Sequence, residues 1–210
     1  MSWRIVTASL LVSVVSSGCT LLAPRADPTR FLVLASTREL SGEDAARADG
    51  TRATSSASLG LGPIRLPEYL ERAELMVRTS ATELTPSRVG RWAEPFGAML
   101  TRVLADDFVQ LLAPERLVVY PWYATDRPQW QVEIDVVRLE PDSKGEVVLL
   151  ARWSVRELAS AGRTFARESR HAHTAERDDP ASIAAAMSAV VSRLAQEIAG
   201  VPMLAERAAE

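Results

Sequence analysis

The fold is decided by residues 130–155, which read WQVEIDVVRLEPDSKGEVVLLARWSV. Apolar and polar residues alternate over the first seven positions, which is the pattern of a strand with one buried face. Apolar residues also share one face from residue 147 to residue 155, after a Pro-Asp-Ser-Lys-Gly turn at 141–145. A second turn at 159–162 precedes a more polar strand at about 163–173. The sequence therefore predicts three consecutive antiparallel strands.

Two amphipathic helices complete the predicted domain. The first runs from about Trp92 to residue 112, with Pro95 in its first turn and Asp106 and Asp107 on its polar face. The second follows Asp179, a good N-cap, and ends at Gly200. Further short strands are predicted at 30–34, 58–66, 75–78 and 117–120, with a surface loop at 38–56. We expect a single α+β domain at 30–200, an antiparallel sheet with two main helices packed on one face. Residues 201–210 are expected to form a C-terminal tail.

The N-terminus has the features of an export signal. After a positively charged start, residues 5–15 form an apolar run too short to span a bilayer. Ser16-Ser17-Gly18-Cys19 then resembles a bacterial lipobox, although Ser16 stands where Leu is usual. We expect a signal peptide at 1–18, lipidation of Cys19 and a tether at 19–29. The alternative is an ordinary secretory signal with an incidental cysteine. Thr20, by analogy with enteric bacteria, where Asp at this position marks the inner membrane, favours the outer membrane.

The composition argues against several function classes. The net charge of -3 over 210 residues lacks the basic excess of a general nucleic-acid binder. The chain has two histidines, His171 and His173, which would share one face of a strand, but zinc normally takes three or four protein ligands. Gly60-x-Gly62 runs into Pro63 and not into a helix, so a packing role is expected instead of phosphate binding. No catalytic residue, metal or cofactor is predicted, and the chain is not expected to be an enzyme. The remaining enzyme hypothesis depends on the two histidines.

Two aromatic residues lack a periodic reason to be buried. Trp122 and Tyr123 lie in the turn-rich stretch 121–126 between predicted strands. Large aromatic side chains on an exposed loop are favoured contacts at protein interfaces. We therefore mark both as a possible interface. The alternative is that Trp122 folds back over the sheet edge.

Two blocks of sequence resemble a known family, the ABC-type transport auxiliary lipoproteins, also called the paraquat-inducible protein C type. The first is GPIRLPEYLER at 62–72 followed by LMVR at 75–78, and the second is RWAEPF at 91–96. The positions that match the family pattern, with a structural or interaction role, are Gly62, Pro63, Pro67, Tyr69, Leu70, Arg72, Arg78, Arg91, Trp92, Glu94 and Pro95.

The resemblance implies a protein anchored in the outer membrane that faces the periplasm. Such a protein would serve an inner-membrane ABC transport complex that carries an MCE-domain protein and moves lipids or hydrophobic compounds between the membranes. It implies an MCE-domain partner and a homo-oligomeric ring, with no nucleic-acid partner. The alternative is a lipoprotein that binds a small apolar ligand in its own pocket. A deep apolar cavity under the long helix would favour that alternative, and a packed core would oppose it.

Overall fold

The larger sheet has five strands in the order β5-β2-β6-β7-β8. The computed structural model of the chain describes residues 27–42, 55–158 and 162–205. The strands of this sheet are β2 (Ser55–Arg65), β5 (Pro114–Val119), β6 (Trp130–Pro141), β7 (Glu146–Glu157) and β8 (Thr164–Thr174). The antiparallel meander of β6, β7 and β8 is confirmed. The antiparallel description does not extend to β2, which runs parallel to both β5 and β6. Parallel neighbours need a crossover connection, and the chain between β2 and β5 is long enough to make one.

A second, three-stranded sheet has the order β1-β4-β3 and was not predicted as a separate sheet. Its strands are β1 (Arg30–Leu32), β3 (Glu74–Ser80) and β4 (Glu83–Trp92). β3 and β4 form an antiparallel hairpin, and β1 runs parallel to β4. The sequence did not reveal β4 because Pro86 and Gly90 interrupt a mostly exposed stretch. An isolated bridge from Arg78 to Asp142 brings this sheet to the far end of β6.

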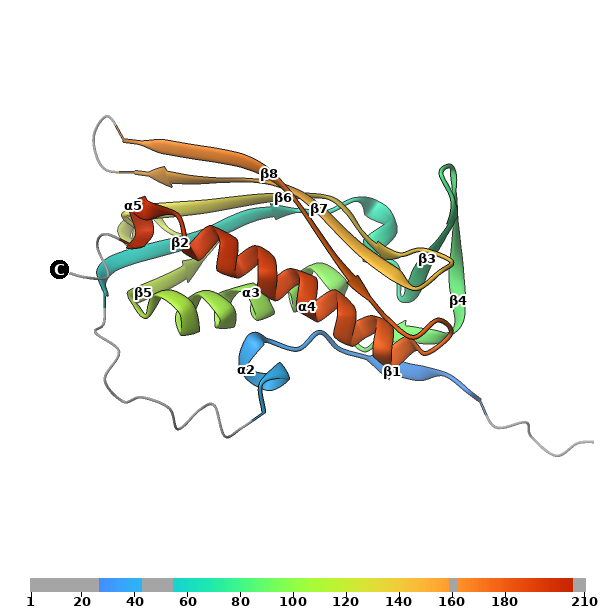
Figure 1. Ribbon diagram of the computed structural model, residues 1–210. Coiled ribbons are helices and arrows are strands. Elements are labelled where there is room, and N and C mark those ends of the chain that lie inside the picture. Colours follow the sequence, from blue (N-terminus) through green and yellow to red (C-terminus); the bar gives the residue numbers. More distant parts are fainter. Residues whose placement is uncertain (1–26, 43–54, 159–161, 206–210) are drawn as a thin grey trace, which may run out of the picture.

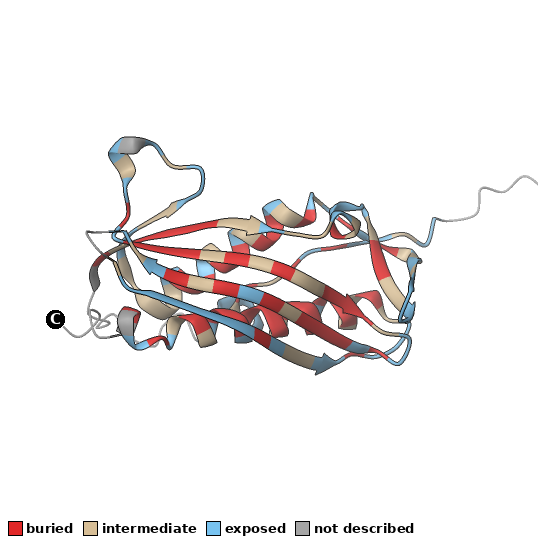
Figure 2. Ribbon diagram, turned by 90° about the horizontal axis from the view of Figure 1, so that it is seen from above, coloured by how far each residue is buried: buried red, intermediate tan, exposed pale blue. Residues whose placement is uncertain are grey.

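Two long helices cover one face of the five-stranded sheet, as predicted (Figures 1 and 2). They are α3 (Phe96–Leu112) and α4 (Pro180–Ala199). α3 begins four residues after the expected start because Trp92 still belongs to β4 and Pro95 is the N-cap. Asp179 caps α4 by accepting hydrogen bonds from the backbone N–H groups of Ala181 and Ser182. The α+β class and the packing of two main helices on one face are confirmed.

The short elements correct two expectations. The predicted loop at 38–56 begins with a capped helical turn, α2 (Thr37–Leu40), and ends inside β2, while residues 43–54 lie outside the described part. The expected tail at 201–210 contributes to the core, because Val201 and Leu204, the latter in α5 (Pro202–Ala205), are buried. The remaining elements are the 3-10 turns η2 (Glu68–Glu71) and η3 (Ala124–Asp126).

The core fills the space between the helices and the five-stranded sheet. Its largest fully buried side chains include Trp130, Phe96, Phe108, Leu61, Met99 and Ile134. Each such side chain contributes about 1.5–3 kcal/mol by leaving water. In the described segments, no helix combines the length and hydropathy needed to span a bilayer.

Asp107 is an exception to the predicted polar face of α3, because it is fully buried. Its carboxylate accepts a hydrogen bond from the Thr37 backbone N–H at 2.7 Å and one from the Ser192 hydroxyl at 3.3 Å. Burial raises the pKa of the Asp107 carboxyl, and these hydrogen bonds oppose the rise in part. Asp107 therefore ties α2 to α3 and α4.

Candidate functional site

The first motif block begins at an irregularity within β2, where the register with β6 shifts between Leu61 and Ile64, and continues into η2. Gly62 has a φ of +113°, a conformation that L side chains rarely adopt, and a cis peptide bond joins it to Pro63. A Cβ on Gly62 would lie 2.8 Å from Cβ of Tyr120, so the site has no room for a side chain. Pro67 is the N-cap of η2, and Leu70 in that turn is buried. The turn thereby presents Tyr69 to the end of β6.

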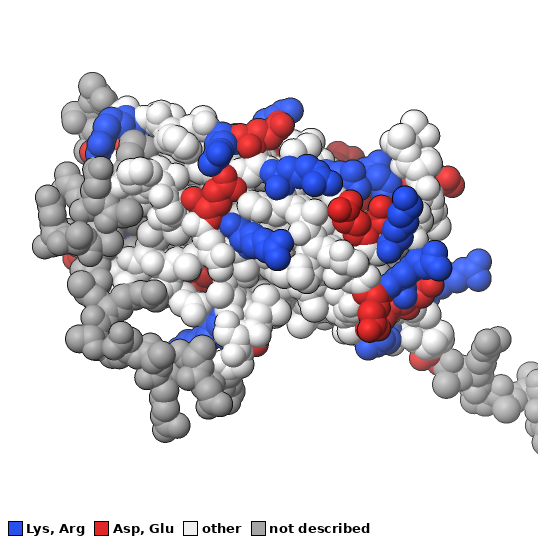
Figure 3. Space-filling model, viewed as in Figure 1, with Lys and Arg blue, Asp and Glu red and all other residues white. Residues whose placement is uncertain are grey.

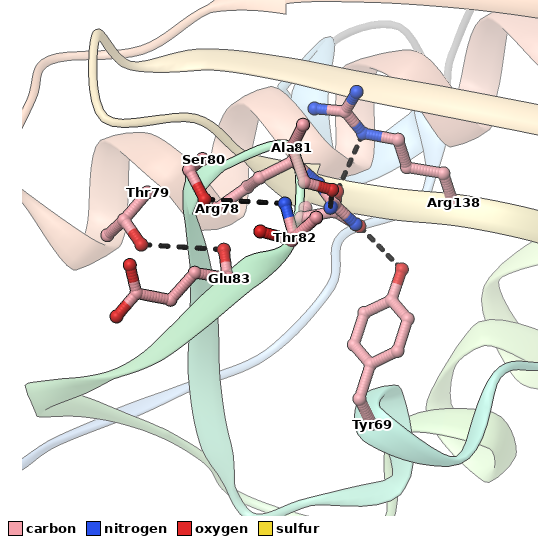
Figure 4. Close-up of polar contacts among 9 residues, drawn as sticks. Tyr69, Arg78, Thr79, Ser80, Ala81, Thr82, Glu83 and Arg138 are labelled. Carbon is pink, nitrogen blue, oxygen red and sulfur yellow. Dashed lines mark hydrogen bonds and ion pairs between the residues drawn. The ribbon is translucent and has the colours of Figure 1, made fainter.

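Glu140, on β6, is the centre of a polar cluster that the sequence did not reveal. Its side chain is only 1% exposed. The Tyr69 hydroxyl donates to Glu140 Oε2 at 2.6 Å, and Arg78 Nε donates to Oε1 at 2.6 Å. Arg138 Nε lies 2.6 Å from the same Oε1 and forms an ion pair without an aligned hydrogen bond. Figure 4 shows Tyr69, Arg78 and Arg138 meeting from three different segments.

The pKa shifts in the Glu140 cluster favour a protonated Tyr69 and a charged Arg78. Burial first, and then the hydrogen bond to Glu140, raise the pKa of the Tyr69 phenol above its usual range. Tyr69 therefore stays a donor at physiological pH. The hydrogen bond to Glu140 raises the pKa of Arg78. Because Arg78 lies on β3 and Glu140 on β6, the cluster joins the two sheets. This is what two motif positions, Tyr69 and Arg78, do in the structure.

The second motif block forms the corner between β4 and α3. Trp92 is buried, and its ring lies 4.9 Å from that of Phe96 at a tilt of 56°. Arg91 pairs with Glu74 on β3, 3.5 Å away. Glu94 forms an ion pair with Arg102, which lies on α3 six residues after its first residue, Phe96.

The remaining motif residues lie around this corner and are exposed. Arg72 Nη2 lies 3.6 Å from Glu74, the same carboxylate that Arg91 reaches. Pro95 is the N-cap of α3, and its side chain is exposed. The first block and the second block therefore meet at Glu74.

The two loop aromatics have different surroundings. β5 and β6 flank β2, so the connection between them crosses β2. There, a Cβ on Gly60 would lie 2.5 Å from the Pro128 ring and 3.0 Å from the Trp122 ring, so both pack against the bare glycine. Trp122 also makes an edge contact with Tyr120, with ring centroids 5.5 Å apart. Trp122 is thus half-buried against the sheet, whereas Tyr123 is 80% exposed.

The two histidines lie on β8 and face α4. His171 Nε2 is 2.9 Å from Oε2 of Glu197, and Glu197 also pairs with Arg167 at 3.0 Å. His173 is exposed, with Nδ1 3.5 Å from Arg193. Among the residues that the structure describes, no group of three or more His, Cys, Asp or Glu is placed to hold a metal ion. His171 is therefore half-buried and in polar contact with Glu197 of α4.

The space beneath α3 is filled by side chains. A small void lined by Ala57, Leu59, Trp130 and Leu204, among others, measures about 20 Å³, which is room for about one water molecule. A larger groove of about 450 Å³ lies outside the core, between the β3–β4 hairpin, the β6–β7 turn and the start of α4. Another, of about 460 Å³, lies on the face of β6 and β7 that the helices leave open, where Arg152 pairs with Glu168.

Known proteins include relatives of this chain in sequence and in structure. The family model for the ABC-type transport auxiliary lipoprotein component matches residues 39–199. A solved structure of a Xanthomonas campestris protein assigned to DUF330 is similar over 77% of this chain and 92% of its own, with 19% identity and a TM-score of 0.58. A second solved structure, titled only as an uncharacterized protein, covers 70% of this chain and 93% of its own, with 15% identity and a TM-score of 0.60. At these identities the likeness concerns the fold. No curated protein gives a significant match.

Proposed function

Because the chain belongs to the ABC-type transport auxiliary lipoprotein family, we propose that it is the membrane-anchored docking component of an ABC transport system. In this proposal its partner is an MCE-domain protein of an inner-membrane complex, and the cargo is lipid or another hydrophobic compound that moves between the two membranes. The observation that carries the proposal is the family match over residues 39–199. The protein would act by binding another protein and not by catalysis.

The packing of the core favours docking over the alternative, in which the domain binds a small apolar ligand in a pocket of its own. A pocket for a small apolar molecule typically measures about 300–1,000 Å³. The void beneath α3 measures about 20 Å³, and Met99, Leu100 and Leu104 on that helix are buried. An apolar ligand beneath α3 would have to displace this core, and the two grooves of about 450 and 460 Å³ lie outside it.

The anchor in this proposal is Cys19, which lies outside the described residues together with the signal peptide at 1–18 and most of the tether at 19–29. Acyl chains on Cys19, palmitate among them, would hold the domain at 30–200 to the outer membrane, with the fold in the periplasm. Each buried CH₂ contributes about 0.8 kcal/mol to membrane affinity, so several chains on one residue anchor durably. Mass spectrometry of the mature N-terminus tests the modification. A Cys19→Ser variant that stays in the membrane fraction would contradict it.

Tyr123 is the residue that we propose for partner contact. It is 80% exposed on a connection that Trp122 and Pro128 hold against β2, so the ring is presented without a large loss of loop freedom on binding. Trp122 would support this contact from below. The motif residues that hold the Glu140 cluster would act on the partner only through the fold.

Co-purification of the lipidated protein with an MCE-domain protein, from membranes that contain both, tests the partnership. Tyr123→Ala should weaken retention by about tenfold, as expected for an aromatic anchor at an interface. Val109→Ala is the matched control, because Val109 is also exposed but lies on α3. If the wild type did not associate with the MCE-domain protein, the proposed partnership would be refuted. If Tyr123→Ala and Val109→Ala weakened retention equally, Tyr123 would not be the contact residue.

We also propose that copies of the chain form a ring, as the family resemblance implies. Light scattering of the detergent-solubilised lipidated protein measures its oligomeric state. A monomer over the whole working concentration range would refute the ring. The partnership with the MCE-domain protein is tested separately, by co-purification.

A further inference from the structure

β1 and the residue that follows it present two apolar side chains to solvent. Phe31 is 71% exposed and Val33 is 56% exposed, whereas Leu32 and Leu34 between and beyond them are buried. β1 is an edge strand of the three-stranded sheet and pairs only with β4 in the described part of the chain. Exposure of a large aromatic side chain on a sheet edge gives up the stabilisation that burial would supply. We therefore expect this edge to contact another surface.

The position of β1 along the chain restricts what that partner can be. Only ten residues, Thr20 to Thr29, separate the proposed lipid attachment site at Cys19 from Arg30 at the start of β1. A fully extended chain of this length spans at most about 40 Å. Phe31 therefore stays within that distance of the bilayer surface at all times.

Tyr123 lies toward the opposite end of the domain. It precedes the start of β6, whereas the three-stranded sheet meets the chain just beyond the end of β6, at the bridge from Arg78 to Asp142. The 12 residues of β6 span about 40 Å. In Figures 1 and 2 the described chain begins at the end away from α5. One end of the domain is thus close to the anchor and the other is removed from it.

The charges around Phe31 suit a lipid surface. In the parallel register Phe31 lies beside Arg91, so these two side chains share one face of the sheet, whereas Arg30 points to the other face and pairs with Asp179. Arg30 is 52% exposed and its partner Asp179 34%, while Arg91 is 47% exposed and its partner Glu74 30%. Each arginine side chain is therefore more exposed than the carboxylate side chain that it pairs with. Figure 3 shows charged side chains of both signs at the end of the molecule where the described chain begins.

We propose that the β1 edge, defined as Phe31, Val33 and Arg91, is a second membrane contact that lays this end of the domain against phospholipid headgroups. Phe31 and Val33 enter the boundary between headgroups and acyl chains, and Arg91 meets lipid phosphates. The inference deepens the proposed function and rests on its lipid anchor. Its consequence is orientation, because a domain held at the β1 edge points Tyr123 away from the membrane.

The test uses the lipidated full chain in vesicles of phosphatidylethanolamine with a minor share of phosphatidylglycerol. Cys19 is the only cysteine and its thiol carries lipid in this proposal, so an introduced cysteine is a unique label site. We would place an environment-sensitive fluorophore on Val33→Cys, and on Tyr123→Cys as the matched control. A quencher attached to the lipid acyl chains should quench the label at position 33 several-fold more than the label at position 123.

A second variant separates the contact from mere proximity. Phe31→Ser in the Val33→Cys background should at least halve the quenching, while circular dichroism stays unchanged because Phe31 packs against little. Equal quenching at both positions, or quenching that ignores Phe31→Ser, would overturn the inference.

Two other results have clear meanings. A protein that fails to float with the vesicles loses the anchor, and this inference falls with it. A label that is unquenched in vesicles but shielded in native envelopes shows that a protein covers the β1 edge, and the lipid contact is then wrong. The vesicles contain no transport partner, so a failure of MCE docking would leave these readouts unchanged.

Discussion

Replacing Glu140 by glutamine removes the charge from the centre of the Glu140 cluster and keeps its shape. The amide can still accept the hydrogen bond from Tyr69, but Arg78 and Arg138 lose the carboxylate that both reach at 2.6 Å. Removing one partner of a fully buried ion pair costs about 3–5 kcal/mol. The side chains of Arg78 and Arg138 are 23% and 30% exposed, so water screens part of the uncompensated charge. We therefore expect the lower end, about 3 kcal/mol.

Urea unfolding, followed by tryptophan fluorescence, measures this free energy. The midpoint should fall without a change in slope, since the surface exposed on unfolding stays the same. In a thermal scan the same loss corresponds to a fall in Tm of about 6–12 °C for a domain of this size. Tyr69→Phe, alone and together with Glu140→Gln, completes a double-mutant cycle that measures the interaction energy between the Tyr69 hydroxyl and the Glu140 charge.

The matched control is Glu168→Gln, which breaks the exposed pair of Glu168 with Arg152 on the open face of the same sheet. Exposed pairs contribute about 0.2–1 kcal/mol, so this variant should unfold close to the wild type. If Glu140→Gln were no more destabilising than Glu168→Gln, the cluster would not join the two sheets energetically, and the structural role that we assign to Tyr69 and Arg78 would be wrong.

Two further changes probe the fold at other points. Gly62→Ala should lower the unfolding free energy by about 1–3 kcal/mol, because the residue has a φ of +113° and a Cβ would meet Tyr120. Gly200→Ala, at φ -75°, should change the unfolding midpoint little. Equal effects of the two substitutions would contradict this explanation. Burial raises the pKa of Asp107, so the native state takes up its proton at a higher pH than the unfolded chain does. The unfolding free energy of the wild type should therefore rise relative to Asp107→Asn as the pH falls from neutrality toward the ordinary carboxyl range, and a difference that does not change with pH would refute this.

The meander and the two long helices could be predicted because their patterns are local. Alternation from Trp130 to Val136 marks one face of a strand, and steps of three and four mark one face of a helix, whatever the rest of the chain does. The expected packing role of Gly60 and Gly62 is confirmed for the same reason, since a bare backbone within a strand signals a close neighbour. Trp122 does fold back onto the sheet, but it packs against Gly60 of the interior strand β2 and not over the sheet edge, and its role with Tyr123 at an interface stays a prediction.

The residues that periodicity placed wrongly are polar ones with distant partners. Asp107 occupies the side of α3 that its neighbours mark as polar, yet it is buried because α2 and α4 supply a backbone N–H and a hydroxyl to its carboxylate. β4 was not recognised because an exposed hairpin strand with Pro86 lacks an apolar face to read.

The sequence by itself determined the β6–β7–β8 meander, the two long helices and, through two short blocks, the family, because each of these depends on residues that are close together along the chain. Only the tertiary structure decided what the motif residues do. Tyr69, Arg78 and Arg138 are separated by up to 69 positions, and nothing in their spacing shows that they share Glu140. A buried charge is stable only with partners, and the choice of partners depends on how the two sheets pack.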